Sequence, residues 1–422
     1  MRPKLFIILA TAALAAAACT QSPAATDFDR SKDPVLPETL LLGTGSGPLA
    51  VQVPTGSVLF DRAGAVASPN GSLVFSATSR GRTTALETLD GATGEVVSNT
   101  KIPGDFRLSV ASGSGHAVAL TEPLPKGWDP ATPLPRSRTA IVVADPSGGQ
   151  APRTYELRGN FEPEAFSTND HRLFLIQHLP AQTPEVYRVT VLDLTKGTVQ
   201  PVFGPYKSPP ERMPGTRLQQ VYAPDGGKLF TLYTSTREGY APHAAPVPSD
   251  AAVSFIHVLS LDEGWAHCVG LPRAMWDQPA SAQALVTSPD GRLLYIVDSV
   301  QGLVTVMNTE TLEILGTHQV DLHRSGVRHT SAVLSADGGT LFVGAGGATS
   351  TLLAIDATTF AVDDRWIAAG DASGIGLSGD GQRLYVALED RVEVFDPTTG
   401  GELGAVPLVS PGPVLEVSAL GT

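Results

Sequence analysis

The sequence predicts an all-β fold built from a repeated unit of four short antiparallel strands. Three observations predict it: a turn motif that recurs along the chain, apolar segments of strand length on both sides of the motif, and a scarcity of helix caps and helical apolar spacing. Gly and Pro make up 77 of the 422 residues, about 18%, against about 12% in average proteins. Charged residues are 17% and hydrophobic residues 42% of the chain, and this composition as a whole excludes a coiled coil, a collagen-like repeat and a charge-rich disordered chain.

The turn motif is clearest in the segment Ser288-Pro-Asp-Gly-Arg-Leu-Leu-Tyr295. Pro-Asp-Gly and Asn-Gly favour turns because Gly tolerates positive φ and because Asp or Asn can hydrogen-bond its own backbone. Further copies, close or loose, begin at Ser68, Ser112, Ser167, Ala223, Ser335 and Ser378. Successive copies lie 43 to 65 residues apart, so each repeat has room for four short strands.

Each repeat is predicted to form one blade of a β-propeller. In the best-defined repeat, strands are expected at Ala284–Thr287, Leu293–Val297, Leu303–Met307 and Ile314–Val320. Four short antiparallel strands in about 40–50 residues are typical of a propeller blade. Acidic residues follow the third strand in several repeats, and we expect them to form turns rather than to bind metal. These residues are Asp193, Asp356 and Asp396.

The segment Leu294–Leu315, which contains Leu294-Tyr-Ile-Val-Asp298 and Val304-Thr-Val-Met-Asn308, strongly resembles the YVTN-type β-propeller repeat of bacterial envelope proteins. Leu341–Asp364 and Leu384–Leu403 resemble it too. The resemblance is good from Gln283 to Leu408 and looser before that. It implies a propeller and an envelope location, and it is nearly silent on function.

The two ends of the domain are predicted to complete the ring. Seven motifs give seven blades, but strand-like segments remain at both ends: Leu40–Gly45, Pro48–Val53, Ser57–Asp61 and Val414–Ala419. The last would be the first strand of an eighth blade, and the others its second, third and fourth strands. Such closure removes exposed strand edges. We therefore favour a single propeller of eight blades over residues 39–422, with seven blades as the alternative.

The N-terminus is predicted to be an export signal. Arg2 and Lys4 precede the apolar run Leu5–Ala18, whose 14 residues are fewer than the roughly 20 that span a membrane. The run ends in four alanines and Cys19, which resembles a bacterial lipoprotein processing site, although Ala16 stands where that motif usually has Leu. The resemblance implies a lipidated Cys19, with palmitate among the acyl groups, as the first mature residue.

The alternative is ordinary cleavage, with Cys19 incidental. We expect residues 1–18 to be removed and residues 19–38 to form a lipidated flexible tether. The protein would then be exported and lipid-anchored on the outer side of a bacterial membrane. Cys268 would have no disulfide partner, and we expect it to be a buried, inert thiol.

Five long insertions are predicted to share one face of the propeller. Glu122–Arg138 and Ser235–Ala251 join the second and third strands of the second and fourth blades, while Phe203–Arg217, Gly270–Ala280 and Asp321–His329 connect blades. In a propeller both kinds of connection open on the same side. We call this side the long-loop face, and the side of the Pro-Asp-Gly turns the turn face. The first three insertions exceed the roughly 12 residues beyond which a loop is usually functional or disordered.

The long-loop face differs from the rest of the chain in charge. Its five insertions hold ten Lys and Arg against seven Asp and Glu, a net charge of +3, which leaves −16 for the remainder of a protein whose net charge is −13. They also gather aromatic residues, and Trp, Tyr and Arg commonly anchor interfaces. The predicted binding residues are Trp128, Arg136, Tyr206, Arg212, Arg237, Tyr240, Arg273, Trp276, Arg324 and Arg328. The alternative is that prolines stiffen solvated loops and the aromatics pack on the rim.

The sequence contains no recognised catalytic or cofactor motif. There is no Gly-x-Ser-x-Gly, His-Glu-x-x-His, Walker or Cys-x-x-Cys-His sequence. His323 and His329, with His318 and Asp321 near them, do not have a recognised zinc-ligand spacing. We therefore predict no metal and no cofactor, and the acidic balance disfavours a nucleic-acid partner.

The favoured function is a membrane-tethered, monomeric binding or scaffold propeller. Its long-loop face would engage an envelope protein or another anionic ligand. The alternative is an enzyme, a lactonase-like hydrolase with a shallow site at the central channel. The polar groups at the channel mouth would distinguish the two, because an enzyme needs convergent acid, base or metal groups there.

Overall fold

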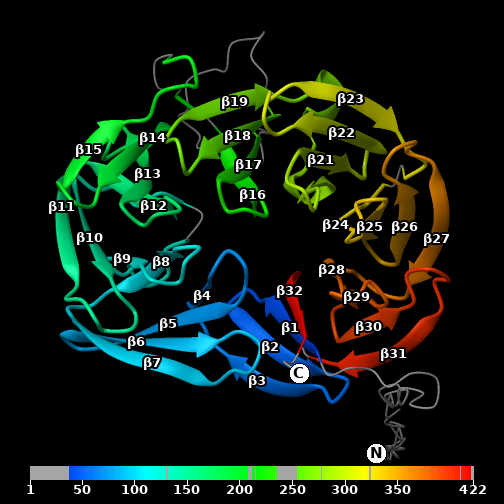
Figure 1. Cartoon of the computed structure of the whole chain (residues 1–422), viewed down its shortest axis with the longest axis horizontal. Helices are drawn as coiled ribbons and strands as arrows, with labels where there is room; N and C mark the ends of the chain where they lie inside the picture. The colour runs from blue at the N-terminus through cyan, green and yellow to red at the C-terminus, as the bar shows by residue number, and fades with distance from the viewer. Residues whose placement is uncertain are drawn as a thin grey trace, which may run out of the picture.

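The computed structural model describes residues 38–129, 132–207, 212–213, 215–234, 254–276, 278–322, 325–408 and 410–419. These residues form eight four-stranded antiparallel sheets, arranged as blades around a common axis (Figure 1). The predicted fold class, an all-β propeller of eight blades, is confirmed. The helices in the described part of the chain are short 3-10 turns, among them Arg273–Met275 and Ala280–Ala282. None of the described helices is long and apolar enough to cross a membrane.

Blades 1 to 4 follow one another along the chain, and each begins with its innermost strand. Blade 1 has β4 (Val66–Ala67), β5 (Leu73–Arg80), β6 (Thr83–Asp90) and β7 (Val96–Pro103). Blade 2 has β8 (Arg107–Ala111), β9 (Val118–Thr121), β10 (Arg138–Ala144) and β11 (Arg153–Arg158). Blade 3 has β12 (Asn160–Phe166), β13 (Arg172–Leu179), β14 (Val186–Asp193) and β15 (Thr198–Pro201). Blade 4 has β16 (Thr216–Tyr222), β17 (Lys228–Thr234), β18 (Ser254–Ser260) and β19 (Ala266–Gly270).

Blades 5 to 7 repeat the same order. Blade 5 has β20 (Gln283–Thr287), β21 (Leu293–Asp298), β22 (Leu303–Asn308) and β23 (Ile314–Gln319). Blade 6 has β24 (His329–Leu334), β25 (Thr340–Gly346), β26 (Ser350–Asp356) and β27 (Val362–Ala368). Blade 7 has β28 (Gly374–Leu377), β29 (Leu384–Ala387), β30 (Arg391–Phe395) and β31 (Glu402–Pro407). The strands predicted in the best-defined repeat agree with blade 5 to within a residue at each end.

Blade 8 is built from both ends of the domain, as the sequence predicts. Its inner strand is β32 (Val414–Ala419), followed outward by β1 (Glu38–Gly43), β2 (Pro48–Val53) and β3 (Ser57–Asp61). β32 runs antiparallel to β1, with Glu38 opposite Ala419 and Leu42 opposite Val414. Figure 1 shows the two ends of the colour scale side by side in this blade. The ring therefore closes without an open seam, and the seven-blade alternative is excluded.

The recurring motif forms the turn between the first two strands of a blade. In blade 5, Ser288 Oγ donates to Asp290 Oδ1 at 2.6 Å and accepts from the Leu293 amide at 2.9 Å. The Arg292 amide donates to the same Asp290 oxygen at 3.1 Å, and Gly291 has a φ of +71°. These hydrogen bonds hold the pKa of Asp290 below its usual range. The repeated Asp is therefore a turn residue, as expected.

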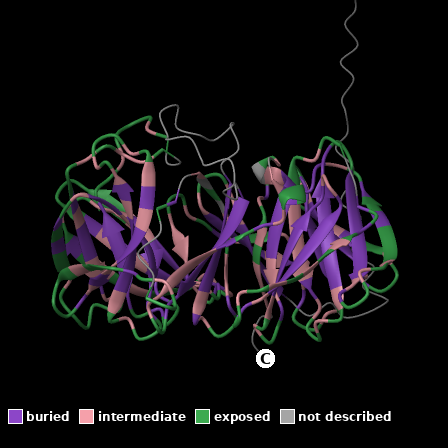
Figure 2. Ribbon diagram, turned by 90° about the horizontal axis from the view of Figure 1, so that it is seen from above, coloured by how far each residue is buried: buried purple, intermediate pink, exposed green. Residues whose placement is uncertain are grey.

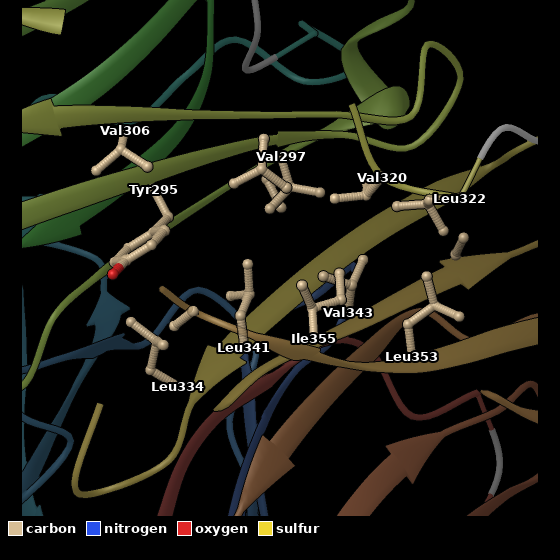
Figure 3. Close-up of a cluster of buried hydrophobic side chains, with 14 residues drawn as sticks. Tyr295, Val297, Val306, Val320, Leu322, Leu334, Leu341, Val343, Leu353 and Ile355 are labelled. Carbon is tan, nitrogen blue, oxygen red and sulfur yellow. The ribbon is translucent and has the colours of Figure 1, made fainter. Parts of the chain in front are cut away.

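Aliphatic side chains fill the seam between two typical blades. Tyr295, Val297 and Val306 of blade 5 pack against residues of blade 6 (Figure 3). The blade 6 side of this cluster includes Leu334, Leu341, Val343, Leu353 and Ile355. Removing such surfaces from water is the main force that holds neighbouring sheets together, at about 25 cal/mol per Å² of apolar area. A typical seam thus needs no charged residue.

The strand directions assign every connection to one of two faces. Neighbouring strands are antiparallel, so the connections between strands two and three, and those between blades, open on the long-loop face. The other turns open on the turn face. The insertions Glu122–Arg138, Phe203–Arg217, Gly270–Ala280 and Asp321–His329 are connections of the first kind, so their described residues lie on the long-loop face. The predicted insertion Ser235–Ala251 lies outside the described residues. In the edge-on view of Figure 2, buried strands lie between exposed connections on both faces.

Candidate functional site

Three predicted binding residues are exposed on the long-loop face. Tyr206 is 93% exposed. Arg212 and Arg273 are exposed, and their side chains make no hydrogen bond or ion pair with another described residue. Arg273 begins a 3-10 turn in the connection between blades 4 and 5. These side chains are available to a partner.

The two tryptophans are tied to their own loops. Trp128 Nε1 donates to the Thr132 carbonyl at 2.8 Å, and Trp276 Nε1 donates to the Leu271 carbonyl at 2.8 Å. Both side chains are half-buried. Each indole therefore shapes its loop, and only part of its surface can contact a ligand.

Arg136, also predicted to bind a partner, is hydrogen-bonded within the fold. Its Nε donates to Asn160 Oδ1 at 3.0 Å and its Nη2 to the Phe161 carbonyl at 2.5 Å. Asn160 Nδ2 in turn donates to the carbonyls of Leu134 and Ala181. This network fastens the connection between β9 and β10 to the inner strand β12. Burial also lowers the pKa of Arg136.

Arg328 is exposed but already has a partner. Its Nη1 lies 3.5 Å from Oδ2 of the buried Asp371. It therefore compensates a buried carboxylate as well as facing solvent. Other predicted residues lie outside the described part of the chain: Cys19, Arg237, Tyr240 and Arg324.

Arginines on the turn face are paired. Arg292 is 83% exposed, and its Nε lies 3.8 Å from Asp290 Oδ2. Arg383 is buried and bonds Glu38 at 3.1 Å and Asp380 at 2.9 Å. Its Glu38 contact joins blade 7 to blade 8. Arg383 thus stabilises the ring. Of these two arginines, only Arg292 can be replaced on the turn face without removing a buried ion pair.

A second group of polar and charged residues lies on and beside the inner strands of blades 2, 3 and 4. These strands, β8, β12 and β16, begin at the long-loop face. We call the group the axial cluster. It consists of Arg107, Arg136, Glu162, Glu164, His178, Arg217 and Gln220. Apart from Arg136, the sequence analysis did not single out any of these residues.

Glu164 crosses the seam between blades 3 and 4. The register of β12 against β13 shifts between Pro163 and Ala165, so Glu164 is an extra residue in the ladder. Such bulges redirect a side chain. Glu164 accepts from Arg217 Nη1 at 2.7 Å and from Gln220 Nε2 at 2.6 Å, both on β16. Burial raises the pKa of Glu164, although the charge of Arg217 opposes this rise.

Glu162 lies on the same strand in a different environment. Its carboxylate is 3.2 Å from Nε2 of the buried His178 and 3.8 Å from Arg107 Nη2. Burial would raise the pKa of Glu162, but the His178 hydrogen bond and the charges of Arg217 and Arg107 hold it below its usual range. The side chain is 37% exposed. It is therefore an ionised carboxylate that solvent and ligands can reach.

Aromatic rings continue from the axial cluster into the seam. His178 contacts Tyr187 at 6.2 Å between ring centroids, and Tyr187 contacts Tyr233 at 5.4 Å. Tyr233 stacks on Phe255 and meets the edge of His257. Burial lowers the pKa of His257 to about 4.

The same seam contains a small cavity. It is lined by Val189, Val202, Met213, His257 and Ala266. This seam is far more polar than the aliphatic seam of Figure 3.

The histidines near Asp321 and the described cysteine have separate surroundings. In the described ranges, no three His, Cys, Asp or Glu residues are placed to hold a metal ion. His318 stacks on Phe360 at 3.8 Å and His329 is exposed, while His323 lies outside the described residues. Cys268 forms no disulfide bond with a described residue, and it is half-buried rather than fully buried as expected.

Sequence reasoning missed the axial cluster because its pairs are distant in the chain. Glu164 and Arg217 are 53 residues apart, and the bulge that joins them cannot be read from local pattern. One signal was present. Glu162-Pro-Glu164 places two acids and a proline in an inner strand, where the equivalent strand of blade 5 reads Gln-Ala-Leu-Val-Thr.

Comparisons with known proteins identify the fold only. No protein family matches the sequence, and no curated protein matches it. Among solved structures, dihydro-heme d1 dehydrogenase NirN in complex with DHE is similar, with 16% identity and a TM-score of 0.54 over 92% of this chain and 76% of that one. AztD from Citrobacter koseri is similar, with 10% identity and a TM-score of 0.54 over 92% and 99%. The periplasmic gluconolactonase PpgL of Pseudomonas aeruginosa has 19% identity over 91% and 100%, but its TM-score of 0.43 is too low to support an argument.

Proposed function

Because the chain is an eight-bladed β-propeller, we propose that it is a binding protein of the bacterial envelope that engages an anionic partner through its long-loop face. The N-terminal sequence supports export and a lipid anchor at Cys19. The resemblance of Leu294–Leu315 to YVTN-type repeats supports the envelope location. A monomer is sufficient, because the ring closes on itself.

The contrast between the two faces carries the proposal. On the long-loop face, the exposed Arg212 and Arg273 have no partner among the described residues. On the turn face, Arg292 lies beside Asp290, and Arg383 is buried between two acids. A guanidinium with unused donors is well suited to a carboxylate or phosphate group. The exposed Tyr206 adds rigid apolar area nearby in the sequence.

The test is binding to an immobilised polyanion, poly-L-glutamate, at several salt concentrations. The variant R212Q/R273Q should bind several-fold more weakly and with a smaller salt dependence, because exposed charges are screened over about 8–10 Å at physiological ionic strength. The matched control is R292Q, an exposed arginine on the turn face. If R292Q weakens binding as much as the double variant, the assignment of the binding face is wrong.

A hydrolase is the second candidate, and the pair formed by Glu162 and His178 favours it. A carboxylate 3.2 Å from a histidine could act as a general acid–base pair, which a hydrolase needs at its active site. The test is turnover of a panel of lactones and aryl esters by the wild type and by E162Q. Turnover that disappears in E162Q supports a hydrolase, and no turnover by the wild type removes this candidate.

A further inference from the structure

The seam between blades 3 and 4 holds buried charge that packing alone does not require. Glu164 is 3% exposed at its side chain, and Arg217, which pairs with it, comes from the next blade. The core of the seam between blades 5 and 6 is apolar, and a neutral hydrogen bond joins Ser299 to Thr330 beside it. A buried ion pair adds little stability compared with apolar residues of similar volume. A buried pair also joins blades 7 and 8, between Arg383 and Glu38. The pair between blades 3 and 4 differs because the Arg217 side chain is 49% exposed, so a ligand can reach it.

Two arginines of the axial cluster keep unused donors. Nε of Arg107 is buried and has no hydrogen-bond partner, and its Nη2 is 3.8 Å from Glu162, too far for a hydrogen bond. Arg217 donates through Nη1 to Glu164, while its side chain remains 49% exposed. Unsatisfied buried donors are rare in folded proteins. An incoming anion would satisfy them.

Two guanidinium groups of the axial cluster are placed to meet an anion. Arg136 is bonded to β12 and has Glu122 within electrostatic reach, which leaves Arg107 and Arg217 as the groups that can bind an incoming ligand. Glu162 lies within electrostatic reach of both Arg107 and Arg217 and is partly exposed. Its oxygens can accept a hydrogen bond from a donor next to the bound anion.

We propose that Arg107, Glu162 and Arg217 form a subsite for a small group that pairs a carboxylate or phosphate with a neighbouring hydroxyl. The arginines hold the anion, and Glu162 accepts from the hydroxyl. This proposal rests on the proposed function. It specifies the chemical group of the anionic partner that would bind where β8, β12 and β16 begin, at the long-loop face.

The experiment is calorimetric titration of the purified chain with four probes: inorganic phosphate, glycerol 3-phosphate, glycerate and glycerol. At least one of the two hydroxylated anions should bind, more tightly than phosphate alone, and glycerol should not bind. Comparison of glycerol 3-phosphate with glycerate decides between a phosphate and a carboxylate. If neither hydroxylated anion binds, the subsite does not exist.

The variant R107Q should weaken binding of the preferred probe about tenfold or more, because it removes charge-assisted hydrogen bonds. Its fold should be unaffected, since Arg107 makes no hydrogen bond with a described residue. The matched control is R292Q, which also removes an arginine 3.8 Å from a carboxylate, but on the turn face. Equal effects of R107Q and R292Q would overturn the assignment.

The variant E162Q should change phosphate binding in the opposite direction from R107Q. Removing the carboxylate removes its repulsion of an anion, so inorganic phosphate should bind several-fold more tightly. The preference for the hydroxylated probe over phosphate should shrink, because the stronger acceptor is lost. A purely structural role of Glu162 would instead weaken every probe equally, and that result would contradict the proposal.

The two proposals can fail separately. If the wild-type protein binds the small anions but not poly-L-glutamate, the proposed role of the loops is contradicted and the proposed subsite is still supported. Intact poly-L-glutamate binding without small-anion binding contradicts the subsite alone.

Discussion

At the residue scale, partners decide what each arginine does. Arg273 is exposed and unpaired with any described residue, Arg136 is hydrogen-bonded to two residues of β12, and Arg383 is buried between Glu38 and Asp380. The same guanidinium therefore serves as a contact for a partner, as a loop fastener, or as a bond between blades. Sequence position alone does not separate these roles.

We predict that Arg383→Ala lowers the free energy of unfolding by about 3–5 kcal/mol, because it leaves the buried carboxylate of Glu38 without its cation. Glu38 would lose its 3.1 Å contact and would retain only the hydroxyl of Tyr385. Urea unfolding of the variant measures the loss. The exposed Arg292→Ala should change stability by less than about 1 kcal/mol, and equal losses would show that the blade 7 contact is not stabilising.

His257 is predicted to make stability depend on pH. Its pKa falls from 6.5 to about 4 on burial, so the unfolded chain binds more protons between these values. The free energy of unfolding should therefore fall as the pH is lowered through this window, by up to about 3 kcal/mol. The neighbours of His257 are His267, Cys268 and Tyr233.

The variant His257→Gln should lose this slope, because glutamine does not titrate. The measurement is urea unfolding at a series of pH values between these two. His329→Gln, at an exposed position, is the control and should keep the slope. A slope unchanged in His257→Gln would assign the pH dependence to other groups.

At the element scale, β32 and β12 show how single strands shape the molecule. β32 is the inner strand of blade 8, and it reaches this position from the far end of the chain. β12 contains the bulge that directs Glu164 to blade 4. One strand closes the ring, and the other gives one seam its charge.

Deletion of Val414–Thr422 should destabilise the whole domain by several kcal/mol, because it removes apolar contacts and exposes the edge of β1. Val414 and Val417 pack against the core of blades 7 and 8. Thermal unfolding of the truncated chain is the measurement. A melting temperature equal to that of the full chain would contradict the closure seen in Figure 1.

At the scale of the whole molecule, turn formation separates charge between the two faces. Asp290, Asp337, Asp356, Asp380 and Asp396 each accept hydrogen bonds within turns of one face. That face is therefore acidic as a consequence of turn chemistry. The long loops escape this constraint and carry the unpaired arginines. β1 also begins on the turn face, where Glu38 contacts Arg383.

The anchor is predicted to be the lipid on Cys19. Mass spectrometry of the mature N-terminus should show an acylated cysteine, and the protein should fractionate with membranes. Two or more chains are needed for stable anchoring, since one holds only weakly. Cys19→Ala should release the protein from the membrane fraction. An unmodified start elsewhere, or membrane association that survives the substitution, would contradict the anchor.

The sequence by itself determined the blade and favoured eight blades closed by both ends of the domain, because these features depend on local chemistry. The turn residues recur every 43 to 65 residues, and apolar segments of strand length lie between them. The tertiary structure excluded the seven-blade alternative. The sequence also determined which face holds the insertions, since strand direction alternates. Only the tertiary structure decided which charged residues meet. Glu164 finds Arg217, and Glu38 finds Arg383, across seams between strands far apart in the chain. The energy of a buried charge depends on these distant partners, which no local pattern encodes.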